Sequence, residues 1–257
     1  MVAANDIRTQ LVQHLKELHL PTIREDFEEV ACCAVQESLS YERYLLELVV
    51  KECEERRHRR IERFLRESCL PLEKTLNTFE LKRLPPKVIQ QVNLLAEGFF
   101  LDKNENILAF GNPGTGKTHL LCGIAQALIR QGRRIYFTKC ALIVQKLLGA
   151  KRDLKLAQEL KKMNKFDAIV IDDIGYVQHD REEMEVLFTL LAERYERGSV
   201  MITSNLPFSK WEKIFKDPMT TAAAIDRVVH HSVILELNIP SYRMEEAQKK
   251  LQPQKEK

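Results

Sequence analysis

Hydrophobic side chains recur at helical spacing in three runs over residues 1–67. The first run follows Asp6, a residue suited to capping a helix, and the second begins after Pro21. The third starts at Tyr41 and continues to Leu65. These runs predict a small all-helical module at residues 1–67. Residues 68–87 contain three prolines and no sustained period, which indicates a linker.

From residue 88 onward, short apolar runs alternate with helical patterns. Runs typical of strands occupy residues 106–110, 134–138, 168–173, 200–203 and 233–237. Helical periodicity lies between them, for example at residues 118–130 and 151–163. The run that begins at Ala168 is continuously apolar, as strands are when both faces of a parallel sheet are covered. We therefore predict a three-layer α/β domain with five parallel strands at residues 88–257.

Composition narrows the class of protein. The chain has 257 residues, of which 44% are hydrophobic and 30% charged, as in soluble, helix-rich proteins. No apolar run approaches the roughly 20 residues of a membrane helix, and the N-terminus lacks a signal-peptide core. The six cysteines form no C-x-x-C pair, which indicates free thiols in a reducing compartment. We expect a cytoplasmic protein that does not contact a membrane.

Charge is distributed unevenly along the chain. Residues 1–80 carry 12 Lys+Arg against 16 Asp+Glu, yet they contain one concentrated basic block. Its arginines are Arg56, Arg57, Arg59, Arg60 and Arg63. They belong either to a solvated helix, paired with glutamates one turn away, or to a helix that tracks nucleic acid phosphates. The rest of the chain favours the second interpretation, so we expect these arginines to bind DNA.

The strongest chemical signal joins the strand at 106–110 to the helix at 118–130. Gly111, Gly116, Lys117 and Thr118 match G-x-x-x-x-G-K-[ST], the phosphate-binding P-loop. Glycines let backbone N–H groups close around phosphate oxygens, and the helix start adds its positive end. Lys117 would reach the β- and γ-phosphates, and Thr118 would ligate Mg²⁺. The loop predicts binding of ATP or GTP by a continuous set of residues: Gly111, Asn112, Pro113, Gly114, Thr115, Gly116, Lys117, Thr118 and His119.

Polar residues at later strand ends would complete the site. Asp172, at the end of the third predicted strand, would hold Mg²⁺, and Asp173 is placed to act as general base on an attacking water. Asn205 follows the fourth strand and would orient that water or touch the γ-phosphate. Arg227 either pairs with Asp226 or reaches the nucleotide of a neighbouring subunit.

Together these motifs resemble the AAA+ ATPases of the DnaA/DnaC clade. Within that clade the chain is similar to the IstB-type ATP-binding proteins of insertion sequences. The resemblance covers nearly the whole chain. It is carried by residues 111–119, 171–176, 181–197, 202–211, 226–231 and 241–243.

The resemblance implies a role for each candidate residue. Lys117 and Thr118 would be the Walker A contacts, and Asp172 the Walker B metal ligand. Asp173 stands where many AAA+ enzymes carry glutamate, and its shorter reach implies slow hydrolysis.

Three further roles are implied in the second half of the ATPase domain. Asn205 would be sensor 1, Arg227 an arginine finger acting in trans, and Arg243 the sensor-2 arginine. Only about 20 residues follow the fifth predicted strand, so the C-terminal lid is expected to be short or absent.

The resemblance also implies a function in DNA transposition. Such a protein would assemble on double-stranded DNA with ATP and Mg²⁺, form a homo-oligomer through ATP-bridged interfaces, and assist a cognate transposase. Two alternatives stay open: a DnaC-like replicative helicase loader, and a P-loop kinase for a small molecule. Preference for single strands and capture of a helicase would favour the loader. A phosphorylated small product would favour the kinase.

Overall fold

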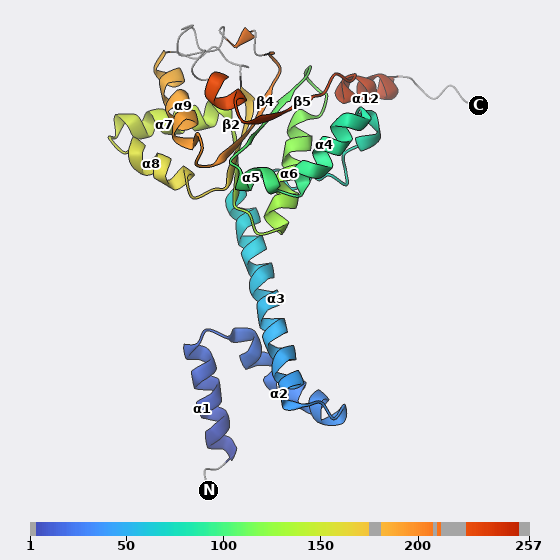
Figure 1. Ribbon diagram of the computed structural model, residues 1–257, viewed down its shortest axis with the longest axis vertical. Helices are drawn as coiled ribbons and strands as arrows, with labels where there is room; N and C mark the ends of the chain where they lie inside the picture. Colours follow the sequence, from blue (N-terminus) through green and yellow to red (C-terminus); the bar gives the residue numbers. More distant parts are fainter. Residues whose placement is uncertain (1–3, 175–180, 208–209, 212–224, 252–257) are drawn as a thin grey trace, which may run out of the picture. The chain divides into compact units, whose positions relative to one another are not determined.

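The computed structural model describes residues 4–174, 181–207, 210–211 and 225–251. The chain divides into two compact units, Met1–Arg63 and Phe64–Lys257. The division falls within a single long helix, α3 (Tyr41–Ser68). Figure 1 labels the elements of both units. Among the helices in the described ranges, none has the length and apolar character needed to cross a membrane.

The first unit is helical. It contains α1 (Ala4–Glu17), α2 (Pro21–Gln36) and most of α3. A buried carboxylate joins α2 to α3, because Glu52 Oε2 accepts the backbone N–H groups of Thr22 at 2.8 Å and Ile23 at 3.2 Å. Glu52 thus accepts hydrogen bonds from the first turn of α2, whose N–H groups have no partner within the helix. The Arg56 side chain donates to the other Glu52 oxygen at 2.7 Å and also to the carbonyl of His19.

The second unit contains a parallel sheet and its covering helices. Its strands are β1 (Asn106–Phe110), β2 (Ile135–Lys139), β3 (Ala168–Ile174), β4 (Ser199–Ser204) and β5 (Ser232–Glu236). Its helices are η1 (Leu81–Arg83), α4 (Pro86–Ala96), α5 (Phe99–Asp102), α6 (Lys117–Arg130), α7 (Cys140–Arg152), α8 (Leu156–Met163), α9 (Arg181–Arg194) and α12 (Tyr242–Leu251).

All described strand pairs are parallel, in the order β2-β3-β4-β1-β5. The predicted five-stranded parallel sheet is therefore confirmed, and each strand lies within two residues of its expected bounds. This order puts the end of β4 between the ends of β1 and β3. The carboxyl ends of these strands form one edge, where ligands of open α/β sheets bind.

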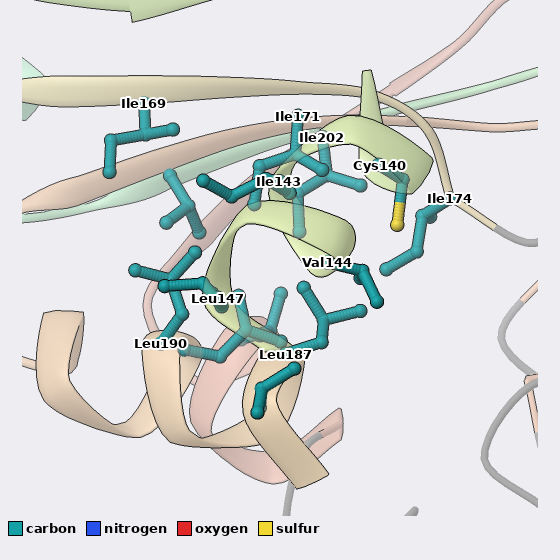
Figure 2. Close-up of a cluster of buried hydrophobic side chains, with 14 of the residues drawn as sticks. Cys140, Ile143, Val144, Leu147, Ile169, Ile171, Ile174, Leu187, Leu190 and Ile202 are labelled. Atoms are coloured by element: carbon teal, nitrogen blue, oxygen red, sulfur yellow. The ribbon is translucent and has the colours of Figure 1, made fainter. Parts of the chain in front are cut away.

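Helices cover both faces of the sheet (Figure 1). On one face α6 contacts β1, β3 and β4, and on the other α7 contacts β2 and β3 while α9 contacts β4. Figure 2 shows α7 between the sheet and α9. Its buried side chains meet those of both neighbours in one apolar cluster, which includes Ile143, Val144, Leu147, Ile169, Ile171, Leu187, Leu190 and Ile202. The predicted three-layer arrangement is confirmed.

A buried arginine closes the amino ends of β3 and β4. The Arg194 guanidinium donates to the carbonyls of Met163 (3.1 Å), Phe166 (2.8 Å), Asp167 (2.9 Å) and Ser199 (2.9 Å). Burial lowers the pKa of this group to about 10, so it stays charged near neutral pH. One guanidinium thus binds carbonyls of the end of α8, the turn before β3 and the start of β4.

Residues 68–87, expected to form a linker, fall within the second unit and contact α6. Gln126 Nε2 donates to the carbonyls of Pro71 (3.3 Å), Leu72 (3.3 Å) and Lys74 (3.1 Å). Leu76 packs so closely on Gly123 that a β-carbon there would lie 2.8 Å from its backbone nitrogen. A side chain of α6 therefore provides hydrogen-bond donors to the backbone of a segment whose only regular element between α3 and α4 is η1.

Candidate functional site

A cavity of about 460 Å³ opens at the carboxyl edge of the sheet, above the start of α6. Three parts of the chain enclose it. The P-loop and the polar strand ends supply one side, the segment before α4 another, and the start of α12 a third. The lining residues are Lys74, Thr78, Phe79, Glu80, Arg83, Pro113, Gly114, Thr115, Gly116, Lys117, Thr118, His119, Asp173, Asn205, Ile239, Tyr242 and Arg243.

The loop before α6 needs glycine at two positions for different reasons. Gly114 has φ +83° and lies against Ser241, so a side chain there would be strained and would collide with the turn before α12. Gly116 has φ +91° and caps α6, and a β-carbon there would lie 2.6 Å from the Phe79 ring. The sequence motif specifies Gly116, whereas Gly114 was expected only as one of the loop residues, and the neighbours that crowd the two glycines were not predicted.

Lys117 begins α6 and is buried, at 5% exposure. Its ammonium donates to the carbonyls of Gly111 at 2.8 Å and Asn112 at 2.9 Å. Burial lowers the pKa of Lys117, while the nearby carboxylates of Asp173 and Asp172 oppose that shift. A buried ammonium held by backbone carbonyls beside an open cavity is well suited to bind a phosphate group.

Asp172 is buried and faces α6, because Ile171 before it faces the α7 cluster and side chains alternate along a strand. One of its oxygens, Oδ1, accepts two hydroxyl hydrogen bonds. Thr118 of α6 and Thr203 of β4 each donate to it at 2.7 Å. The P-loop helix and the ends of two strands thus meet at one carboxylate oxygen.

Asp173 lines the cavity beside Asp172. Its backbone has φ +60°, a left-handed conformation that aspartate tolerates better than most residues. Burial and the neighbouring Asp172 raise the pKa of the Asp173 carboxyl, against the opposing effect of Lys117. A carboxylate with a raised pKa in a cavity is a candidate general base.

Asn205 also lines the cavity, one residue beyond β4. Its side-chain oxygen Oδ1 is buried and has no hydrogen-bond partner among the described residues. A buried acceptor of this kind is suited to a donor supplied from the cavity, such as a water molecule.

The segment before α4 forms a wall that the sequence did not predict. The His119 ring nitrogen Nε2 lies 3.0 Å from both the Thr75 carbonyl and the Thr78 hydroxyl. Because a carbonyl only accepts, Nε2 carries the proton in this contact. The Phe79 ring meets the His119 ring edge-on, with 5.3 Å between centroids. No periodic pattern marks these residues, so only their contacts with α6 reveal them.

The start of α12 forms the opposite wall and brings Arg243 to the cavity. The Tyr242 N–H donates to the Gly114 carbonyl at 3.0 Å, which fixes the helix start to the P-loop. Arg83 of η1 holds α12 from the other side, since its guanidinium donates to Glu245 at 2.7 Å and lies 5.3 Å from the Tyr242 ring centroid. Within the described residues, α12 is the one helix that follows β5, where the lid was expected to be short or absent.

Arg227 is not among the described residues that line the cavity. It lies in a helical stretch at residues 225–229, before β5, and its guanidinium is over the Phe188 ring at 5.0 Å. The neighbouring Val228 carbonyl accepts from Asn106, the first residue of β1, at 3.0 Å. Arg227 therefore lies toward the amino edge of the sheet and does not reach the P-loop of its own chain.

The arginines of α3 differ in their surroundings. Arg56 is held by Glu52, and Arg59 lies 3.9 Å from Glu55. Arg57 and Arg60 are exposed, and within the described part of the chain neither has an ion pair. Arg63 is exposed as well. Ion pairs within the helix thus involve Arg56 and Arg59, and DNA binding by the other members stays a prediction.

Comparison with known proteins identifies the family. A model described as IstB-like ATP binding protein matches residues 13–250. The chain belongs to this family. The resemblance stated from its motifs is thereby confirmed.

Individual relatives carry similar descriptions. The chain is 45% identical to an insertion sequence ATP-binding protein of Sinorhizobium fredii over 234 residues, which cover 91% of this chain and 78% of that protein. It is 34% identical to the IS5376 ATP-binding protein of Geobacillus stearothermophilus over 251 residues, or 98% and 99% of the two chains. For the IS21 ATP-binding protein of Pseudomonas aeruginosa, identity is 33%, with 93% and 89% covered.

Solved structures agree on the fold. The DnaC helicase loader superposes with a TM-score of 0.56 at 18% identity, over 65% of this chain and 97% of that one. AMPPCP-bound DnaA from Aquifex aeolicus gives 0.56 at 16% identity, over 74% and 58%. At these identities the likeness shows a shared AAA+ fold and carries no conclusion about activity.

Proposed function

We propose that this IstB-like protein is an ATP hydrolase that assembles on double-stranded DNA and assists a transposase. The observation that carries the proposal is the convergence of four chemically distinct groups on one cavity. These are the ammonium of Lys117, the carboxylate of Asp173, the amide of Asn205 and the guanidinium of Arg243. Two cations for phosphates, a base and a water-orienting group are the components that phosphoryl transfer to water requires.

The oxygen donors beside the P-loop fit a magnesium ion. Mg²⁺ prefers oxygen ligands and usually binds proteins through one or two carboxylates or hydroxyls together with substrate phosphates. Thr118 and Asp172 supply one hydroxyl and one carboxylate, already joined by a hydrogen bond. The described residues contain no cluster of three or more His, Cys, Asp or Glu side chains that would hold a metal without the nucleotide. When bound, the ion would neutralise charge on the β- and γ-phosphates.

Asp173 and Asn205 would act on the attacking water. The raised pKa of Asp173 makes its carboxylate a better proton acceptor than an ordinary aspartate. The unpartnered Oδ1 of Asn205 would accept the second proton of that water in a hydrogen bond. Together they would orient the water toward the γ-phosphate.

Assembly of several subunits is inferred from Arg227, which does not line the cavity of its own chain. Arg227 lies away from the P-loop of its own chain, so any contact with a nucleotide requires a neighbouring subunit. An arginine supplied in this way can raise phosphoryl transfer rates by about 10³–10⁵-fold. We therefore infer a homo-oligomer in which ATP lies at the interface between two protomers.

The DNA partner is inferred from α3 and from the relatives. Arg57 and Arg60 lack ion pairs within the described residues, so their charge is available to phosphates. The relatives are described as ATP-binding proteins of insertion sequences, which supports a role in transposition. A replicative helicase loader remains the alternative, because the DnaC loader shares the fold.

The proposal is tested by measuring ATP hydrolysis and particle mass with duplex DNA, with single-stranded DNA and without DNA. We expect duplex DNA and ATP together to produce large particles and the highest rate. Lys117→Ala should abolish nucleotide binding and assembly. A rate that does not respond to DNA would contradict the proposal, and preference for single strands with capture of a helicase would identify a loader.

A further inference from the structure

β3 and β4 lose their regular pairing beside the cavity. Ile171 pairs with Ile202, and the next pair is Ile174 with Ser204. Two residues of β3, Asp172 and Asp173, therefore lie opposite Thr203 alone. This arrangement is a β-bulge, in which one extra residue is accommodated and the strand changes the direction of its side chains.

The bulge decides where the Asp173 carboxylate lies. With regular alternation Asp172 would face α6, and Asp173 would face the apolar cluster with Ile169 and Ile171. Instead, Ile174 takes that place in the cluster (Figure 2), and Asp173 lines the cavity. The left-handed backbone of Asp173, with φ +60°, is the local cost of this change.

One hydroxyl group holds the bulge in place. The Asp173 N–H donates to Thr203 Oγ1 at 2.8 Å, and the Thr203 hydroxyl donates to Asp172 Oδ1 at 2.7 Å. A hydroxyl has one proton and two lone pairs, so both bonds form together. Thr203 is fully buried, so its hydroxyl makes these bonds away from solvent.

We propose that Thr203 is a positioning residue for ATP hydrolysis, whose hydroxyl fixes Asp172 toward Thr118 and keeps the Asp173 carboxylate in the cavity. The proposal rests on the proposed hydrolase function. Valine at this position keeps the shape of threonine but removes both hydrogen bonds, leaving the part-buried Asp173 N–H without its acceptor. Serine keeps the hydroxyl and removes only a methyl group.

The test compares Thr203→Val, Thr203→Ser and a control in the same strand, Ser199→Ala. The Ser199 hydroxyl is buried and has no partner among the described residues, so its loss changes the strand but not the site. For each variant, kcat, KM, the Mg²⁺ concentration at half-maximal rate and the nucleotide affinity without Mg²⁺ are measured, with a thermal melt to check folding.

We expect Thr203→Val to lower kcat by about 10–100-fold and to raise the half-saturating Mg²⁺ concentration by a similar factor, as is typical when a partner of a metal ligand is lost. Its nucleotide affinity without Mg²⁺ should stay within about threefold of the wild type, because Lys117 and the loop are intact. Thr203→Ser should restore both parameters, and Ser199→Ala should leave them unchanged.

Wild-type kcat and Mg²⁺ dependence in a folded Thr203→Val protein would overturn the proposal. If that variant does not fold, Thr203→Ser decides, since loss of hydrolysis in a folded serine variant would assign the role to the methyl group. If the wild type hydrolyses no ATP, the proposed function fails. The Mg²⁺ dependence of nucleotide binding then still tests Thr203 by itself.

Discussion

The hydroxyl of Thr118 donates to Asp172 Oδ1 at 2.7 Å and thereby joins the first turn of α6 to the end of β3. With its proton committed to the carboxylate, the Thr118 oxygen keeps its lone pairs for a cation. This geometry requires Asp172 to accept, which an ionised carboxylate does with both oxygens. The two residues that the motifs predicted independently thus form one hydrogen-bonded pair.

Asp172→Asn should separate the structural and ionic parts of this contact. The asparagine oxygen can still accept from Thr118 and Thr203, so we expect the melting temperature to change by no more than about 2–4 °C, equivalent to about 1 kcal/mol in a protein of this size. The lost negative charge should weaken Mg²⁺-dependent nucleotide binding by about tenfold or more. Calorimetric titration with and without Mg²⁺ measures this, and equal affinities in wild type and variant would show that Asp172 does not act through a cation.

Asp173→Asn should trap an ATP-bound complex on DNA. Asparagine tolerates the left-handed backbone of this position but cannot accept a proton, so kcat should fall by about 10²–10⁴-fold. Filter binding and single-turnover hydrolysis on duplex DNA measure the two effects. Normal turnover in this variant would show that another group is the base.

The raised pKa of Asp173 has a defined effect on pH dependence. The acid limb of the kcat profile should lie above the ordinary pKa of aspartate and should disappear in Asp173→Asn. Because the folded state favours the protonated carboxyl, ionisation at higher pH lowers the free energy of unfolding. Asp173→Asn should therefore be the more stable protein near neutral pH. The difference should shrink as the pH falls through the raised pKa and vanish below the ordinary pKa of aspartate.

Gly114→Ala should weaken nucleotide binding by more than its backbone strain explains. A left-handed alanine costs about 1–2 kcal/mol, and the added methyl group would also displace Ser241 and the start of α12. Gly132→Ala is the matched control, because Gly132 has φ +91° and no other group lies within 4 Å of the place that a β-carbon would take. Both variants should melt earlier, but only Gly114→Ala should lose nucleotide affinity, by about tenfold.

Removing the Ser241 side chain in the same protein separates crowding from strain. The double variant Gly114→Ala with Ser241→Gly should regain part of the affinity, since the colliding atoms belong to Ser241. No recovery would mean that the P-loop backbone alone is responsible.

Sequence patterns predicted those parts of the site whose residues are close along the chain. The P-loop and the strand before Asp172 are local patterns, and the alternation from Ile171 directs Asp172 toward α6 without further information. The five strands follow from apolar runs in the same way. The order of β4 between β1 and β3 agrees with the placement of Asn205 beside the P-loop.

The remaining parts depend on contacts between distant segments. In the sequence, Thr203 has no feature that distinguishes it from other strand residues. Its two hydrogen bonds form because β3 carries one extra residue opposite it. Phe79 and Thr78 belong to an aperiodic segment whose place beside His119 is set by packing on α6. Neither Thr203 nor the Phe79 segment is marked by a periodic pattern, so the sequence alone did not reveal their roles.

The arginine block should divide into structural and DNA-binding members. Replacing Arg57 and Arg60 by alanine should make the dependence of log affinity for duplex DNA on log salt shallower. The magnitude of the negative slope should fall by about 2, or about 0.9 for each lost phosphate contact. Arg43→Ala, which removes an arginine paired with Glu47 on the same helix, is the control and should leave the slope unchanged. An unchanged slope in the double variant would favour the interpretation of the block as part of a solvated helix that does not bind DNA.

Arg56→Ala should behave differently from that pair. Its loss would leave the buried Glu52 without its cationic partner, so the free energy of unfolding should fall by about 1–3 kcal/mol, the cost of an unpaired buried group. Thermal denaturation checks this. A weaker salt slope without loss of stability would place Arg56 among the DNA contacts.

β3 and β4 are held together by different groups at the two edges of the sheet. At the amino edge the planar guanidinium of Arg194 binds carbonyls of the end of α8, the turn before β3 and the start of β4 through four hydrogen bonds. At the cavity edge the hydroxyls of Thr203 and Ser204, both on β4, bridge to β3 across the bulge. The contacts between β3 and β4 at the amino edge therefore come from a planar group with fixed donor directions, whereas those at the cavity edge come from hydroxyls that can rotate.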